Sequence, residues 1–201
     1  MESIEPSAEQ ERIAALTAQV RRDLARIAHP RMPWLQARPA PGGEPALDVL
    51  IVGAGQSGLA IAFGLMRAQV DNILVIDKAE YGREGPWLTY ARMRTLRSPK
   101  DYTGPDLDVP SLTYQAWHEA RFGAHSWNAL ELIARELWAE YLLWIRETTA
   151  IPVRNGLEAI DIAPAAHDLI AVTLQGGGGS RETLHTRKLV LATGMEGMGG
   201  W

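Results

Sequence analysis

One stretch of sequence decides the fold: Asp48-Val49-Leu50-Ile51-Val52-Gly53-Ala54-Gly55-Gln56-Ser57-Gly58. The residues before the first glycine form a short, β-branched apolar run that predicts a strand. A helix is predicted after the last glycine, because apolar residues recur there at helical spacing, at Leu59, Ala62, Phe63 and Met66. Ile73 to Ile76 then predict a second strand. A strand, helix and strand in this order form two parallel strands joined by a crossover helix.

The glycines of this stretch follow the pattern G-x-G-x-x-G, placed directly after a strand and at the opening of a helix. The first glycine permits a tight turn, the second lets a pyrophosphate approach the backbone, and the third lets helix and strand pack closely. The helix N-terminus offers N–H groups and the positive end of its dipole to the anion. Without this context the pattern would be only a glycine-rich turn; in it, the pattern predicts a dinucleotide site.

Asp77 lies at the end of the second predicted strand, near the ~20-residue offset expected of the acid that binds ribose hydroxyls. A carboxylate there repels a 2′-phosphate, so the site favours FAD or NAD over NADP. The alternative is a solvated aspartate at a strand end. Because glycine pattern and acid fall in register, dinucleotide binding is the favoured interpretation.

An amphipathic helix is predicted upstream, from a capping box of Ser7 and Gln10 to His29-Pro30. Such a helix either packs on its own domain, the commoner case, or binds a partner. Prolines and glycines then make a tether that sustains neither a helix nor a central strand. We therefore divide the chain into a helix and tether, 1–45, and a nucleotide-binding domain, 46–201.

Downstream, residues 80–128 are expected to be mostly irregular and to contact ligand. A second capping box, Asn128 with Glu131, predicts a core-facing helix whose apolar face is Leu130, Ile133, Leu137, Tyr141 and Trp144. An antiparallel meander is predicted over Leu157–Ile162, Leu169–Leu174 and Arg181–Thr186, and a final strand over Lys188–Ala192. The last residues follow without a closing element, so the chain is expected to be incomplete at its C-terminal end.

These segments resemble the FAD half of flavin-containing monooxygenase-like proteins, within the flavoproteins that have two dinucleotide-binding domains. The resemblance runs loosely from Leu47 to Trp201 and is carried by Asp48 to Asp77, Gly85-Pro86-Trp87, Tyr90 to Lys100 and Lys188 to Gly194. It implies an α/β, Rossmann-like FAD-binding domain with a parallel sheet, a crossover helix and an antiparallel meander, preceded by a helical extension.

The resemblance also implies roles for particular residues. Gly85, Pro86 and Trp87 would lie against the flavin and its pyrophosphate, Leu157 would present backbone atoms to adenine, and Ala192 to Gly194 would turn beneath the nucleotide. Trp87 is equally well read as core filling. The residues predicted to contact the cofactor are Gly53, Ala54, Gly55, Gln56, Ser57, Gly58, Asp77, Lys78, Gly85, Pro86, Trp87, Arg94, Leu157, Ala192, Thr193 and Gly194.

The segment from Tyr81 to Lys100 is locally basic in an acidic protein. It carries one acidic residue, Glu84, against Arg83, Arg92, Arg94, Arg97 and Lys100. This is either a solvated face or a place where an arginine meets a cofactor phosphate.

Composition excludes several classes of protein. The chain has 201 residues, no cysteine and a net charge of −4, which rules out thiol chemistry and disulfides and favours neither nucleic acid nor an anionic membrane. The five histidines show no ligand spacing, so no metal is expected. Neither a signal peptide nor an apolar run long enough to span a membrane is present, and a cytoplasmic protein is the default expectation.

The function expected from these features is that of an NAD(P)H-dependent flavin monooxygenase acting on a small organic substrate, with no catalytic side chain assigned. The second glycine pattern and the Phe-x-Gly-x-x-x-His signature of that family do not occur in the chain. Two alternatives therefore stay open. The chain is a non-catalytic FAD-binding module or truncated subunit, or, less favoured, an NAD-dependent dehydrogenase.

Overall fold

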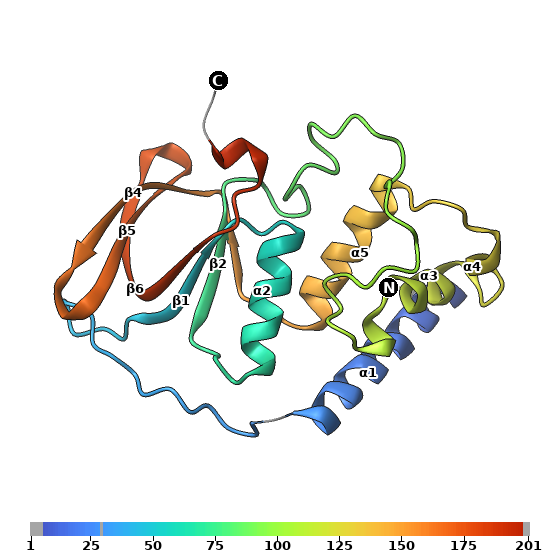
Figure 1. Cartoon of the computed structure of the whole chain (residues 1–201), viewed down its shortest axis with the longest axis horizontal. Coiled ribbons are helices and arrows are strands. Elements are labelled where there is room, and N and C mark those ends of the chain that lie inside the picture. Colours follow the sequence, from blue (N-terminus) through green and yellow to red (C-terminus); the bar gives the residue numbers. More distant parts are fainter. Residues whose placement is uncertain (1–5, 29, 199–201) are drawn as a thin grey trace, which may run out of the picture. The chain divides into compact units, whose positions relative to one another are not determined.

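The computed structural model describes residues 6–28 and 30–198, and shows an α/β protein (Figure 1). His29 and the last three residues, where the predicted first helix and the C-terminal domain end, lie outside this range. The main helices are α1 (Ala8–Ile27), α2 (Gln56–Arg67), α3 (Tyr114–Phe122), α4 (Ser126–Ala129) and α5 (Arg135–Thr148). The strands are β1 (Leu47–Val52), β2 (Ile73–Asp77), β3 (Val153–Asn155), β4 (Leu157–Ala165), β5 (Leu169–Gly176) and β6 (Arg181–Leu191).

Contacts divide the chain into two compact units. The sheet unit is 29–91 with 151–201, and the helical unit is 1–28 with 92–150. This grouping does not coincide with the linear division after residue 45 proposed from the sequence, because α1 groups with residues 92–150 and the tether groups with the sheet.

In the sheet unit, six strands lie in the order β3-β2-β1-β6-β5-β4. Strands β3, β2, β1 and β6 are parallel, while β6, β5 and β4 form the antiparallel meander. The core is centred on Leu50, Ile76, Val172 and Leu174, each fully buried. The predicted fold class and the parallel pairing of the first two strands are confirmed.

Two details of the sheet differ from the prediction. The third meander strand and the final strand are a single strand, β6, which pairs with β5 through its first half and with β1 through its second. No turn-forming residue separates Thr186 from Lys188, so nothing in the sequence interrupts it. The short strand β3 was not predicted, because three residues are too few to show a period.

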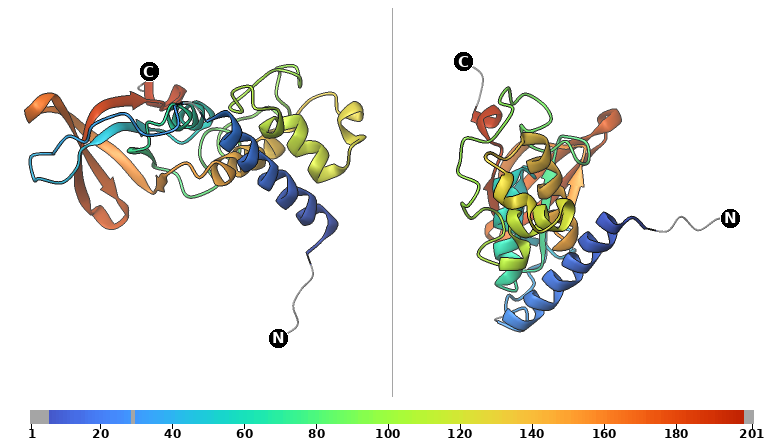
Figure 2. Two further views of the ribbon diagram at one scale, coloured as in Figure 1. Left: turned by 90° about the horizontal axis from the view of Figure 1, so that it is seen from below. Right: turned by 90° about the vertical axis from the view of Figure 1, so that its right-hand side faces the viewer.

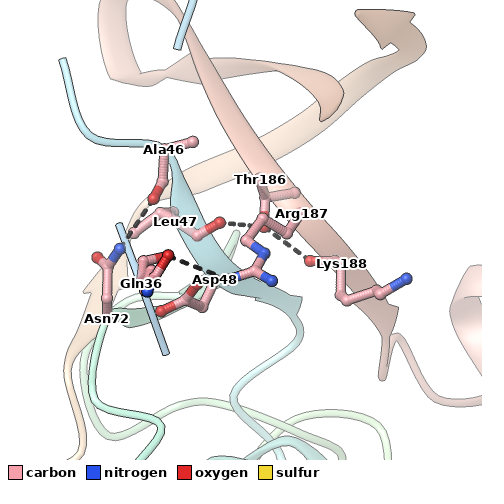
Figure 3. A network of polar contacts seen from close by, with 8 residues as sticks. All are labelled: Gln36, Ala46, Leu47, Asp48, Asn72, Thr186, Arg187 and Lys188. Carbon is pink, nitrogen blue, oxygen red and sulfur yellow. Dashed lines mark hydrogen bonds and ion pairs between the residues drawn. The ribbon is translucent and has the colours of Figure 1, made fainter. Parts of the chain in front are cut away.

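A polar network fixes the amino end of β1 (Figure 3). The buried Asp48 carboxylate accepts a hydrogen bond of 2.9 Å from Arg187, which also donates to the Gln36 carbonyl in the tether. Asn72 donates to the Ala46 carbonyl at 2.8 Å. The tether, which forms no helix or strand, is thereby attached to the sheet.

In the helical unit, α1 runs alongside α3, as Figures 1 and 2 show. The predicted capping box of Ser7 and Gln10 is present, and Val20 is fully buried. Arg12 donates to the carbonyls of Ala120 and Arg121 at the end of α3. The helix therefore packs within its own unit, as the commoner reading of its periodicity predicted.

Residues 80–128 are more regular than predicted, because α3 and α4 lie among them. Helix α3 is capped by Thr113, whose side chain accepts from the Ala116 N–H, and it buries a stripe of Tyr114, Trp117 and His118. That stripe has helical spacing, so the signal was present in the sequence. It was overlooked because aromatic residues and histidine replace the usual aliphatic ones.

The predicted capping box of Asn128 and Glu131 is wrong. Asn128 lies inside α4, and α5 begins only at Arg135. The residues between are held extended, because Ile133 O accepts from Leu96 N at 2.8 Å and Ala134 forms a β-bridge with Thr95. The predicted apolar residues Tyr141 and Trp144 are nevertheless buried on α5.

Candidate functional site

The turn between β1 and α2 is built on a glycine that no other residue can replace. Gly53 has φ +107°, in the left-handed region, and its N–H donates to Ile76 O at 2.7 Å. A Cβ on Gly53 would collide with the Ala192 carbonyl oxygen and lie 2.8 Å from the carbonyl carbon. The turn thus fits against both β2 and the end of β6 only without a side chain.

Gly58 lets α2 pack directly against this turn. A Cβ at Gly58 would collide with the Gly53 carbonyl oxygen and lie 3.0 Å from the Gly53 carbonyl carbon. Both neighbours are backbone atoms and cannot turn aside. The third glycine therefore fixes the close approach of helix and strand that dinucleotide binding requires.

The amino end of α2 is shaped for an anion. Gly55 is its N-cap and provides no side-chain cap, and no acidic residue lies in the first turn of the helix. The first backbone N–H groups of a helix have no partner within it and carry the positive end of its dipole. A phosphate placed there would meet amide donors and no carboxylate from the first turn of the helix.

Asp77 lies at the mouth of the glycine loop, where the sequence placed it. Its Oδ2 accepts from the Ala54 N–H at 2.7 Å and its Oδ1 accepts from the Ala79 N–H at 2.8 Å. The carboxylate therefore braces the loop in addition to any contact with ligand, a role that sequence spacing does not reveal. Each oxygen keeps a second lone pair that could accept from a ribose hydroxyl.

The structure brings Gly85 against the glycine loop. Gly85 has φ +72°, and a Cβ there would lie 3.6 Å from the Gly55 Cα. Trp87 packs its ring 3.7 Å from the same position, and Thr89 Oγ1 donates to Gly85 O at 2.8 Å. The segment Gly85-Pro86-Trp87 thus approaches the glycine loop, with the backbone of Gly85 close to the second glycine.

Other predicted residues flank this centre. Ala192 N donates to Val52 O at 2.8 Å, so the turn of Ala192, Thr193 and Gly194 begins directly beside the glycine loop. Lys78 is exposed next to Asp77. Leu157 begins β4 and its side chain packs on the core of the sheet unit.

From Arg92 onward, the basic segment belongs to the helical unit. Arg94 belongs to the helical unit, where its carbonyl accepts from Arg135 N at 3.2 Å. Lys100 donates to the carbonyls of Trp127 and Leu130 and lies over the Trp127 ring. Lys100 is therefore engaged in holding its own unit together, and its charge is not part of a free anion-binding face.

One polar residue of the site was not predicted. Asn155 ends β3, and its Cα is the register partner of Asp77 in the neighbouring strand. Its Nδ2 donates to Glu84 Oε1 at 2.7 Å and to Ala79 O at 3.1 Å. Because β3 itself escaped prediction, nothing in the sequence marked this asparagine as standing beside the acid.

Two other expectations concern absence. Within residues 6–28 and 30–198, no three histidine or acidic side chains group so that they could hold a metal ion. No helix in the same ranges is long and apolar enough to cross a membrane.

A Rossmann-like nucleotide-binding unit is defined by three features together: a glycine turn closed by backbone on two sides, a helix end without a side-chain cap from its N-cap residue, and an acid at the next strand end. Residues 50–196 match the model of the FAD-NAD(P)-binding family, and the chain belongs to that family. The family resemblance inferred from sequence is confirmed.

Among curated proteins, the chain is 48% identical over 190 residues to an FAD-dependent urate hydroxylase from Xanthomonas campestris. The alignment covers 94% of this chain and 39% of that protein, so the chain spans well under half the length of this relative.

Among solved structures, the chain resembles an ornithine hydroxylase from Pseudomonas aeruginosa, with a TM-score of 0.61, 19% identity and coverage of 73% of this chain and 38% of that one. It also resembles an FAD-bound cadaverine monooxygenase from Erwinia amylovora, with a TM-score of 0.56, 17% identity and coverage of 75% and 36%. At these identities the likeness shows a shared fold.

Proposed function

We propose that this chain is the FAD-binding part of an FAD-dependent hydroxylase. The observation that carries the proposal is the glycine loop, whose Ala54 N–H is held by Asp77 and whose Gly55 is approached by Gly85. Glycine backbone lines the place where a pyrophosphate would lie. The family match and the urate hydroxylase relative support FAD as the cofactor that carries this pyrophosphate.

FAD is favoured over a phosphorylated nicotinamide cofactor at this loop. Asp77 presents a carboxylate where the adenosine ribose would lie, and the charge of a 2′-phosphate would be repelled there. The ribose hydroxyls of FAD would instead donate to this carboxylate. NAD(P)H enters the proposal as the electron donor, which would act on the bound flavin from elsewhere.

The residues of the chain bind and orient the cofactor. Gly53 to Gly58 would hold the pyrophosphate, Asp77 with Lys78 the adenosine ribose, and Leu157 the adenine through its backbone. Gly85, Pro86 and Trp87 would lie along the pyrophosphate and flavin, and Ala192, Thr193 and Gly194 beneath the nucleotide. Arg94 is proposed for a cofactor phosphate. Flavin supplies the redox chemistry when bound, and the protein supplies position, electrostatics and exclusion of water.

For the substrate we propose a purine of the urate type. The support is the curated relative, with which the chain shares 48% identity over 94% of its length. No side chain of this chain is assigned as an acid, base or nucleophile, since oxygen activation belongs to the flavin.

Two measurements test the proposal in turn. Titration of the purified chain with FAD, followed by quenching of flavin fluorescence, should show saturable binding. ADP should compete with FAD for the site, and 2′-phospho-ADP should compete at least about tenfold more weakly than ADP. A chain that binds NAD but not FAD would support the dehydrogenase alternative instead.

Turnover is measured separately. The FAD-loaded chain is mixed with NADPH or NADH in air, with and without urate, and oxygen uptake is followed. Urate-dependent oxygen uptake supports a hydroxylase activity in this chain. Tight FAD binding without any oxygen uptake supports the alternative of a non-catalytic FAD-binding module.

A further inference from the structure

We infer that Asn155 is a positioning residue that holds the segment 79–87 closed over the nucleotide site. The inference rests on the proposed binding of FAD at the glycine loop. It concerns a side chain that neither the glycine pattern nor the family match singles out, and it explains how Gly85 is kept against Gly55.

The position of Asn155 is set by the sheet. Strand β3 pairs in parallel with β2, and the last register pair is Asp77 with Asn155. Side chains of directly paired residues in parallel strands project from the same face of a sheet, so the asparagine stands beside the acid at the carboxyl edge. Ligands of doubly wound sheets bind outside this edge.

From there, Asn155 uses both N–H bonds of its amide on one segment. Nδ2 donates to the carbonyl of Ala79 at 3.1 Å and to Oε1 of Glu84 at 2.7 Å. The Gly156 N–H donates to the same Ala79 carbonyl at 3.1 Å. Two points in the loop after β2, Ala79 and Glu84, are therefore both anchored to the end of β3.

These hydrogen bonds connect the glycine loop, the end of β2 and the Gly85 segment to one another. Asp77 holds Ala54 in the glycine loop and Ala79 beyond β2. Asn155 then links Ala79 to Glu84, and Glu84 is followed directly by Gly85, which lies against Gly55. A break at the asparagine would free the Gly85 segment while leaving the glycine loop and its brace in place.

The bond to Glu84 is the strongest link contributed by Asn155, because its acceptor is a carboxylate on a half-buried side chain. Asparagine is suited to this place because aspartate has no N–H to donate and would put a second negative charge against Glu84.

The test compares dissociation constants for FAD in single and double variants of the full chain. Glu84→Ala should weaken FAD binding about tenfold, the loss of one charge-assisted hydrogen bond. Asn155→Ala should weaken it at least as much, because it also loses the hydrogen bond to the Ala79 carbonyl. The double variant should bind FAD no more weakly than Asn155→Ala, because the asparagine substitution already breaks the link to Glu84. Glu84→Gln should bind within about threefold of the wild type, because its amide oxygen still accepts from Asn155.

Arg154→Ala is the matched control. Arg154 is the preceding residue of β3, and its exposed side chain pairs with Glu182. This variant loses a polar contact from the same strand but none that touches the segment 79–87, and its FAD affinity should stay within twofold of the wild type.

The outcomes separate this inference from the proposed function. If the wild type binds FAD but Asn155→Ala binds it equally well, the role of Asn155 is overturned and the proposed function stands. Additive losses in the double variant have the same consequence. Absence of FAD binding by the wild type overturns the proposed function and this inference with it. If Asn155→Ala fails to fold, Glu84→Ala decides, since Glu84 lies on a loop outside the sheet: a loss of about tenfold supports the link and none overturns it.

Discussion

Replacing Asp77 by alanine should lower both the folding stability of the free chain and its affinity for FAD. In the free chain, the substitution removes the acceptor of two backbone N–H groups, those of Ala54 and Ala79, at 2.7 and 2.8 Å. Hydrogen bonds to a charged group contribute roughly 1.5–3 kcal/mol each when buried. Because Asp77 is only half-buried, we expect the two together to contribute about 2 kcal/mol to folding.

For a chain of this length, that loss should lower the midpoint of thermal unfolding by about 4–8 °C. In the FAD-bound chain, the same substitution also removes the acceptor of the ribose hydroxyls, so FAD affinity should fall by a further ~2 kcal/mol, close to thirtyfold. Circular dichroism melts measure the first effect and flavin fluorescence titration the second.

Asp71→Ala is the control, because Asp71 is an exposed carboxylate just before the same strand. It should change neither quantity. A variant Asp77→Ala that melts earlier but binds FAD as tightly as the wild type would show that the carboxylate is only a brace for the loop, and would refute its proposed contact with ribose.

Three further predictions concern packing and charge. Gly58→Ala should cost about 1–3 kcal/mol in folding free energy and weaken FAD binding, because its Cβ has backbone of Gly53 in its way; unchanged urea midpoint and FAD affinity would contradict this. Tyr114→Phe should be neutral or stabilising, because the Tyr114 hydroxyl is buried and has no hydrogen-bond partner among the described residues. Tyr141→Phe should instead cost about 1 kcal/mol of folding free energy, because the Leu112 carbonyl loses its donor. Thermal melts of both variants beside the wild type test this difference, and equal losses of stability would contradict it. Burial lowers the pKa of His118 below its usual 6.5, so the stability it contributes is complete above that pH and is lost as the pH falls below it; the drop in melting temperature from pH 7.5 to pH 5.5 should be smaller in His118→Phe, and an equal drop would disprove the titration.

Features of the fold and of the site could be predicted from the sequence where the residues that form them lie close together in the chain. The glycine loop and its flanking strand and helix are fixed by residues close in sequence, and Asp77 follows from one crossover, so their arrangement was foreseen. The meander was also predicted, since alternating strands with turns between them leave a local pattern. Strand β3 and Asn155 were missed because their place depends on pairing with β2 across a long insertion.

The insertion itself shows the opposite limit. Ile133 and Leu130 fall on a helical stripe, yet pairing of residues 133–134 with 95–96 keeps them outside α5. Tertiary pairing there overrode a local capping signal. Likewise, the positive charge of Lys100 looked available in sequence, and only the structure shows that two carbonyls in its own unit hold it.

The most direct test of the central claim is a crystal structure of the chain with FAD. We predict the pyrophosphate at the amino end of α2, within hydrogen-bond distance of backbone N–H groups between Gly53 and Gly58, and a ribose hydroxyl on the Asp77 carboxylate. FAD bound away from this loop, or a loop filled by side chains in crystals grown with saturating FAD, would contradict it.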